Sequence, residues 1–287
     1  VLNYLQYDSV RALEIANQCT LKIIPILNPD GARDYTRVNA NQIDLNRDAQ
    51  DLTQPESRIL KKEYESFQPD FCFNLHDQRT IFNVGKTNKP ATVSFLAPAF
   101  DVERNNSPSR KLSMQLIAAM NSKLQDLIPG QVGRYDDGFN ANCVGDAFQM
   151  RETPTILFEA GHYYEDYQRE KTREFIFHAL LKGINTIALN QIEDFTVDQY
   201  LVIPENGKQF VDISIINSKD SNKVGVIKNS FSIQYKEVLV EDKVVFSPVK
   251  HIFETTPTEI FAHKTFNLEV KEDLEWLKKH DILKLLN

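Results

Sequence analysis

The sequence predicts an α/β protein with a mixed central sheet and helices on both faces, followed by a small β-rich appendage at the C-terminus. Up to about residue 190, short apolar runs typical of buried strands alternate with longer segments whose apolar residues recur at helical spacing. From about residue 195, alternating β-branched segments replace that pattern. We therefore divide the 287-residue chain into a main domain, residues 1–192, and an appendage, residues 193–287.

The periodicity of the apolar residues places the elements in order. We expect buried strands over residues 21–27, 71–75, 92–96 and 155–158. We expect helices at the start of the chain and over residues 55–67, 109–128 and 168–189, with a polar loop over residues 33–50. In the appendage we expect strands over residues 210–216, 223–227 and 231–246, and a charged helix over residues 271–286.

The composition excludes several classes of protein. With 41% hydrophobic and 25% charged residues, the chain is typical of a globular protein rather than a disordered one. A net charge of −7 argues against a nucleic-acid partner, because phosphates require a basic face. No apolar run approaches the ~20 residues that cross a bilayer, so we expect no membrane partner. The three scattered cysteines, Cys19, Cys72 and Cys143, do not fit a disulfide scaffold and favour a reducing compartment such as the cytoplasm.

Polar side chains follow three of the predicted strands at the point where each strand ends. Asn28 opens Asn-Pro-Asp-Gly, His76 follows an apolar run, and Glu159 comes directly after another. Functional groups of such sheets gather beyond the carboxyl ends of the strands. A neutral imidazole there can bind a metal, and a carboxyl in a partly apolar setting has a raised pKa that suits a general base. Taken singly, each residue also has a structural explanation: a turn, a core histidine and a surface carboxylate.

The polar loop between residues 37 and 48 concentrates arginine and asparagine side chains. Arg37 lies near its start, and the adjacent Asn46 and Arg47 lie near its end. A guanidinium presents a rigid fork that matches a carboxylate, and an arginine near a reacting carbon can stabilise an oxyanion. The loop therefore indicates recognition of an anionic substrate, with a solvated charged loop as the structural alternative.

Together, these motifs resemble the zinc carboxypeptidase family, the metallocarboxypeptidases related to pancreatic carboxypeptidase A. The resemblance covers roughly residues 1–190, and the order, the spacing and the structural context of the motifs all agree with it. It implies a zinc-dependent enzyme that hydrolyses the C-terminal peptide bond of a peptide with a free terminal carboxylate. His76 matches the family's late zinc ligand, Glu159 the general base that deprotonates the zinc-bound water, and Arg37 the arginine that polarises the scissile carbonyl.

The resemblance also implies residues that hold the substrate. Asn46 and Arg47 match the pair that grips the terminal carboxylate. Asp44 matches the carboxylate that orients the family's first zinc histidine. Tyr135 is our candidate for the family's mobile tyrosine, which hydrogen-bonds the substrate.

One departure from the family concerns the metal. The family's first two zinc ligands come from a His-x-x-Glu motif, and no histidine precedes His76 in this sequence. One ligand is present where three are needed, so we expect this polypeptide to be N-terminally incomplete and inactive alone.

Two alternatives to a carboxypeptidase remain open. Zinc deacylases of N-acylamino acids, such as aspartoacylase and succinylglutamate desuccinylase, resemble the same family and share the Asp-Leu-Asn-Arg motif of residues 44–47. The Asn-Pro-Asp-Gly turn and the Phe-Glu-Ala-Gly context favour the peptidase. A non-catalytic module that binds carboxylates without metal is the second alternative, which a protein that truly starts at Val1 would favour.

Overall fold

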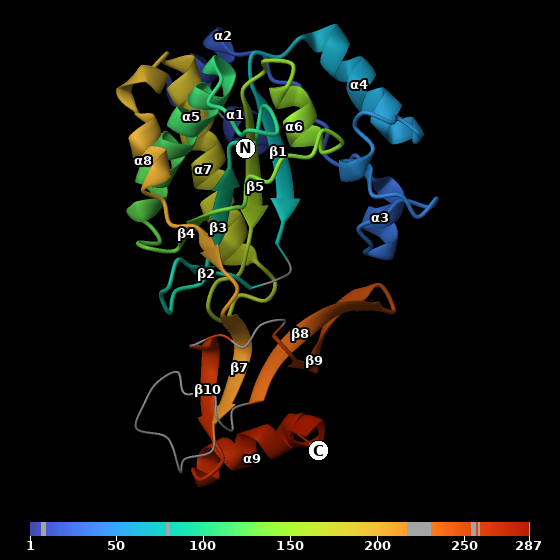
Figure 1. Cartoon of the computed structure of the whole chain (residues 1–287), viewed down its shortest axis with the longest axis vertical. Helices are drawn as coiled ribbons and strands as arrows, with labels where there is room; N and C mark the ends of the chain where they lie inside the picture. Colours follow the sequence, from blue (N-terminus) through green and yellow to red (C-terminus); the bar gives the residue numbers. More distant parts are fainter. Residues whose placement is uncertain (7–9, 79–80, 217–230, 254–256, 258, 287) are drawn as a thin grey trace.

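A computed structural model describes residues 1–6, 10–78, 81–216, 231–253, 257 and 259–286. It confirms a mixed α/β fold (Figure 1). In this part of the chain the first sheet has the strand order β1-β5-β3-β4. Its strands are β1 (Cys72–Asp77), β3 (Val93–Leu96), β4 (Val132–Arg134) and β5 (Thr155–Ala160). β1 runs parallel to β5, β5 antiparallel to β3, and β3 parallel to β4, so the sheet is mixed.

Helices surround this sheet. They are α1 (Leu2–Gln6), α2 (Val10–Gln18), α3 (Pro29–Asp34), α4 (Pro55–Phe67), α5 (Pro108–Gln125), α6 (Val144–Gln149), α7 (Glu170–Ala188) and α8 (Val197–Leu201), with 3-10 turns η1 (Leu45–Arg47) and η2 (Ile192–Asp194). α5, α7 and α8 lie together on the left of the sheet in Figure 1, whereas α4 and α6 lie to its right. α5 begins where Ser107 caps it by accepting a hydrogen bond from the backbone N–H of Arg110, and Pro108 fits the first turn because it has no N–H to satisfy.

Alternation along β5 separates the core face of the sheet from the face that carries Glu159. Ile156 and Phe158 are fully buried in a cluster with residues of α5 and α7, including Leu116 and Phe175. Each such side chain contributes about 1.5–3 kcal/mol by leaving water. Because successive strand residues point to opposite faces, Glu159 projects away from this core.

A second sheet follows in the chain, with the strand order β10-β7-β8-β9 in its described part. The additional strands and helices are β2 (Asn83–Val84), β6 (Asn206–Gly207), β7 (Phe210–Ile216), β8 (Phe231–Val240), β9 (Lys243–His251), β10 (Phe261–Asn267), α9 (Lys271–Lys279) and η4 (Ile282–Leu286). Ile213, Ile215 and Ile233 pack against Leu277 of α9 and Ile282 of η4. β1 and β5 point toward this sheet in Figure 1, and the β8–β9 hairpin extends toward α3. None of the described helices is both long and apolar enough to cross a bilayer.

Four expectations about elements differ from the structure or lie beyond it. The single helix expected over residues 271–286 is interrupted, because α9 ends at Lys279 and Asp281, at positive φ, precedes η4. The expected strand over residues 21–27 is wrong, because that segment pairs with no strand in the described part of the chain. A strand requires a partner for its backbone groups, and a large cavity separates this segment from the free edge of β1. Residues 231–246 form parts of two strands rather than one, and the turn between them places Glu241 and Asp242 at positive φ. The expected strand over residues 223–227 lies outside the described residues.

Candidate active site

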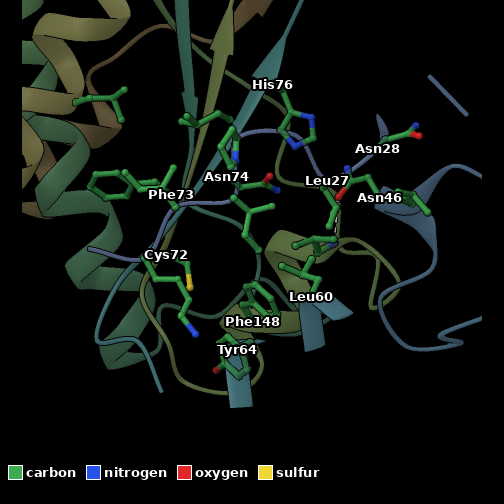
Figure 2. Close-up of a pocket in the computed structure, with 18 of the residues that line it drawn as sticks. Leu27, Asn28, Asn46, Leu60, Tyr64, Cys72, Phe73, Asn74, His76 and Phe148 are labelled. Carbon is green, nitrogen blue, oxygen red and sulfur yellow. Dashed lines mark hydrogen bonds between the residues drawn. The ribbon is translucent and has the colours of Figure 1, made fainter. Parts of the chain in front are cut away.

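A cavity of about 1260 Å³ lies along the free edge of β1, and its lining takes in residues from both faces of that strand together with Leu180 and Ile184 of α7. Its lining includes His76 from β1, Glu159 from β5, Tyr135 after β4, and Arg37, Asp44 and Asn46 from the polar loop. Figure 2 shows the side chains of Asn28, Asn46, Asn74 and His76 at one end and those of Leu60, Tyr64, Cys72 and Phe148 at the other. The cavity therefore has a polar end and a more apolar end.

The sheet register places His76 and Glu159 side by side. They are directly paired residues of the parallel strands β1 and β5. Paired residues of adjacent strands project to the same face, so the imidazole and the carboxyl enter the cavity together. The short apolar runs before them anchor both positions, because those residues pack in the core and fix the register.

The environment of Glu159 changes its acidity. The pKa of the Glu159 carboxyl is raised to about 8, mainly by burial and in part by the nearby Asp77 carboxylate, against the opposing charge of the Arg37 guanidinium. This agrees with the raised pKa expected from the sequence. A carboxyl with a pKa near neutrality is suited to accept and return a proton.

His76 is held as a neutral imidazole. Burial lowers its pKa, and the charges of Arg37 and, more weakly, Arg47 add to this against the opposing carboxylates of Asp77 and Asp44. Its Nε2 atom is buried and has no hydrogen-bond partner among the described residues. A buried nitrogen of this kind normally has a partner, so this atom is available to a ligand, a substrate or a metal ion.

A row of polar side chains along β1 was not predicted from the sequence. Asn74 and Gln78 flank His76 at two-residue spacing and line the same cavity. Asn74 Nδ2 and both amide atoms of Gln78 are buried without a hydrogen-bond partner in the described part of the chain. The two-residue period of a strand, counted from His76, is the signal that identifies them. We therefore add both residues to the candidate site.

Asn28 builds the turn that carries Arg37. Its Oδ1 accepts from the backbone N–H of Gly31, 2.9 Å away, and caps α3, so Asn28-Pro29-Asp30-Gly31 is a helix start rather than a simple turn. Asn28 Nδ2 also donates to the carbonyl of Arg37 at 3.4 Å. The Arg37 side chain is largely exposed, and its Nε donates to Asp44 Oδ2 at 2.7 Å. Asn28 and Asp44 thus hold the backbone and the guanidinium of Arg37 respectively.

The carboxylate-binding pair predicted from the sequence is divided between the cavity and the surface. Asn46 lines the cavity, and its Oδ1 accepts from the N–H of Val144 at the start of α6, 3.1 Å away. Asp44 accepts from the backbone N–H of Asn46 at 2.9 Å and so caps η1. Arg47 is exposed, outside the cavity lining, and its Nη1 donates to the Asn46 carbonyl. It acts on the cavity through its charge.

Tyr135 lies in the cavity near Glu159. Its ring contacts Phe82 edge-on, with the ring centroids 5.7 Å apart. Burial raises the pKa of its hydroxyl, and the negative charge of Glu159 raises it further. The tyrosine is therefore neutral and able to donate a hydrogen bond into the cavity.

The described residues do not by themselves form a site for a catalytic zinc ion, which takes three protein ligands. His76 offers a buried, unpartnered nitrogen. Within the described ranges, however, no group of three or more histidine, cysteine, aspartate or glutamate side chains could hold a metal ion. Further ligands would have to come from elsewhere.

Comparisons with known proteins assign no family. No protein-family model matches the chain, and a search of curated proteins returns no match.

Proposed function

We propose that this chain is part of a hydrolase, and more narrowly of a carboxypeptidase that removes the last residue of a peptide. The observation that supports this most is the convergence of His76, Glu159, Arg37 and Asn46 on one cavity, although they come from distant segments. In that order they supply an imidazole ligand, a general base, a cation and an amide. This set is suited to acyl transfer to water.

The residues of the chain have distinct tasks in this proposal. Glu159 takes a proton from the attacking water and delivers it to the leaving amine. Arg37 stabilises the negative charge that develops on the carbonyl oxygen. Tyr135 donates a hydrogen bond to the bound peptide. The raised pKa of Glu159 supports its role, because the same carboxyl has to accept and then release a proton.

Recognition of the chain end is assigned to the 3-10 turn η1. Asn46 offers its side-chain Nδ2, since its Oδ1 already accepts from Val144. Arg47 offers a bidentate guanidinium at the surface beside it. A free terminal carboxylate held there would restrict cleavage to the last peptide bond. Peptides with a free C-terminus are therefore the proposed substrates.

We propose zinc as the metal of the intact protein, with His76 as one ligand and two further ligands from residues outside this sequence. The lack of a three-ligand group in the described residues favours the alternative of a carboxylate-binding module without metal. Reading the gene upstream of Val1 separates the two: a His-x-x-Glu motif supports the enzyme, whereas a start codon at Val1 supports the module.

Replacement of Arg47 by alanine tests the assignment to exopeptidases. In the intact zinc-loaded protein, Arg47→Ala should raise KM for peptides with a free C-terminus by about tenfold or more, because a charged hydrogen bond is lost. Amidated peptides should show little change. The matched control is Arg33→Ala, which removes an exposed guanidinium from α3.

Equal losses on free and amidated peptides would remove the exopeptidase assignment. Parallel assays on N-acylamino acids identify the deacylase alternative, since a deacylase would hydrolyse them in preference to short peptides.

A further inference from the structure

The segments that leave the two site strands both dock on the second sheet. After β5, Tyr167 donates from its hydroxyl to Asp212 of β7 at 2.7 Å, and Glu165 forms an ion pair with Lys264 of β10 at 3.1 Å. After β1, Ile81 packs in a buried cluster with Phe210 and Phe261 of the second sheet. The segments that follow His76 and Glu159 in the chain are therefore held by contacts with the second sheet.

Arg169 joins the ends of the two site strands to each other. Its Nη1 donates to Asp77 Oδ2 at 3.0 Å and to the carbonyl of Ala160 at 3.4 Å. Asp77 and Ala160 are register partners, one residue beyond His76 and Glu159. Arg169 therefore clamps the strand ends that present the imidazole and the carboxyl.

The same guanidinium is anchored from the second sheet by Glu237. Arg169 Nη2 donates to Glu237 Oε1 at 2.6 Å, and the Glu237 side chain, on β8, is 5% exposed. The Arg169 backbone is left-handed, with φ of 57°, which is unfavourable for a residue with a side chain. Its surroundings hold the residue in that conformation.

Glu237 also reaches the segment that carries Arg37. Its other oxygen, Oε2, accepts from the hydroxyl of Tyr35, which ends α3 two residues before Arg37. One buried carboxylate on β8 thus binds both the clamp on the strand ends and the turn that leads to the proposed oxyanion-stabilising arginine. Figure 1 shows the β8–β9 hairpin reaching toward α3.

We infer that Glu237 of the second sheet is a positioning residue of the site: through Tyr35 it fixes the Arg37 segment, and through Arg169 it fixes the ends of β1 and β5. The second sheet is then a working part of the site rather than an independent appendage. Its catalytic consequence rests on the carboxypeptidase proposed above.

Two variants separate the two contacts of Glu237, one with Tyr35 and one with Arg169. Tyr35→Phe removes the hydroxyl and leaves the Arg169 pair intact, whereas Glu237→Gln weakens both contacts. Glu241→Gln makes the same chemical change at the exposed turn of the same hairpin and is the control. Amide hydrogen exchange of the intact protein measures the result without any assay of activity.

We expect Tyr35→Phe to speed exchange over residues 33–38 by about tenfold, and Glu237→Gln to speed it there and over residues 160–169. Glu241→Gln should change neither segment. Unchanged exchange at both segments in both variants would overturn the inference. If Glu237→Gln speeds exchange throughout the chain, the exchange of residues 33–38 in Tyr35→Phe decides whether the contact with Glu237 holds the Arg37 segment.

Kinetics of the intact zinc-loaded protein test the catalytic consequence. Because Arg37 acts on charge that develops during the reaction, both variants should lower kcat by about tenfold and leave KM within about twofold. A purely structural defect would lower the active fraction of the enzyme, so active-site titration corrects for it. Faster exchange with unchanged kcat would overturn the positioning role. An inactive wild-type protein would instead sink the carboxypeptidase proposal, while the exchange data would still decide the anchoring by Glu237.

Discussion

At the scale of single residues, the site depends on a carboxyl whose acidity is set by its position at the end of β5. Glu159 follows four buried strand residues, and the burial of its own carboxyl is the first cause of its raised pKa. His76 sits opposite it in register, as a neutral imidazole whose Nε2 has no partner among the described residues. Burial is the common cause of the two pKa shifts, since it raises the pKa of Glu159 and lowers that of His76.

Glu159→Gln should abolish most of the activity of the intact protein. The amide keeps the shape of the carboxyl but cannot accept a proton, so kcat should fall by about 10² to 10⁴-fold with a much smaller change in KM. Steady-state kinetics on a free-carboxylate peptide measure this. Glu103→Gln, in the exposed loop before α5, is the matched control. A Glu159→Gln enzyme with near-normal kcat would exclude Glu159 as the base.

The residue types at the site were more predictable than their contacts. His76 and Glu159 were predicted because they end apolar runs, and the structure brings them to one cavity. Asn74 and Gln78 were not predicted, because a polar residue in a strand indicates a site only when it is known which face of the sheet its side chain lies on. The outward position of Arg47 could not be predicted either, since it depends on the 3-10 turn η1.

At the scale of elements, the short helix α3 controls where Arg37 lies. Its capping residue Asn28 accepts from Gly31 and donates to the Arg37 carbonyl. Gly31 is buried in this turn, and a Cβ there would contact the Asn28 amide and stand 2.7 Å from the carbonyl oxygen of Thr36. The glycine is required by close packing of the backbone.

Gly31→Ala should therefore displace the Asn28 cap and lower the free energy of unfolding by about 1–2 kcal/mol, the usual cost of a lost cap. Urea denaturation measures this change. Ala32→Ser, at the next and exposed position of α3, should have a small effect. If the two variants are equally stable, the contact between Asn28 and Gly31 does not support α3.

Strand pairing explains why some elements were predicted and one was not. Runs such as residues 155–158 became strands because partners lie on both sides of them in the sheet order. Residues 21–27 have the same apolar character but no pairing strand in the described part of the chain, and Ile23, Ile24 and Ile26 remain exposed. Local sequence reports the tendency to form a strand, whereas pairing depends on the rest of the fold.

At the scale of the whole molecule, two cores are joined by a junction that combines the apolar cluster of Ile81, Phe210 and Phe261 with polar contacts. Arg169 donates a hydrogen bond to Glu237, 68 positions later in the sequence, and Tyr167 donates one to Asp212, 45 positions later. No local pattern predicts such contacts, because each residue alone is typical of a loop or a strand surface. The sequence predicts a main domain and an appendage, but it gives no sign of the contacts between them.

The buried Asp212 makes the stability of this junction depend on pH. Burial raises its pKa from 3.8 to about 6, against hydrogen bonds donated by the Tyr235 backbone and the Tyr167 hydroxyl. Because the folded-state pKa is the higher one, the protonated form stabilises the fold, and this stability is lost as pH rises from about 4 through 6.

We expect the wild-type protein to lose about 2 kcal/mol of stability, relative to Asp212→Asn, between about pH 4.5 and 7.5. Chemical denaturation of both proteins across this range measures the difference. Asp242→Asn, at the exposed β8–β9 turn, serves as the control and should track the wild type. A constant difference between wild type and Asp212→Asn would show that Asp212 does not titrate in this range.

Mass spectrometry of peptide products tests the central claim most directly. The intact zinc-loaded protein is incubated with two peptides of the same sequence, one with a free C-terminal carboxylate and one amidated. Stepwise removal of single residues from the C-terminus of the free peptide, with the amidated peptide left intact, is the predicted result. Internal cleavage, equal trimming of both peptides or no hydrolysis of either would contradict the assignment.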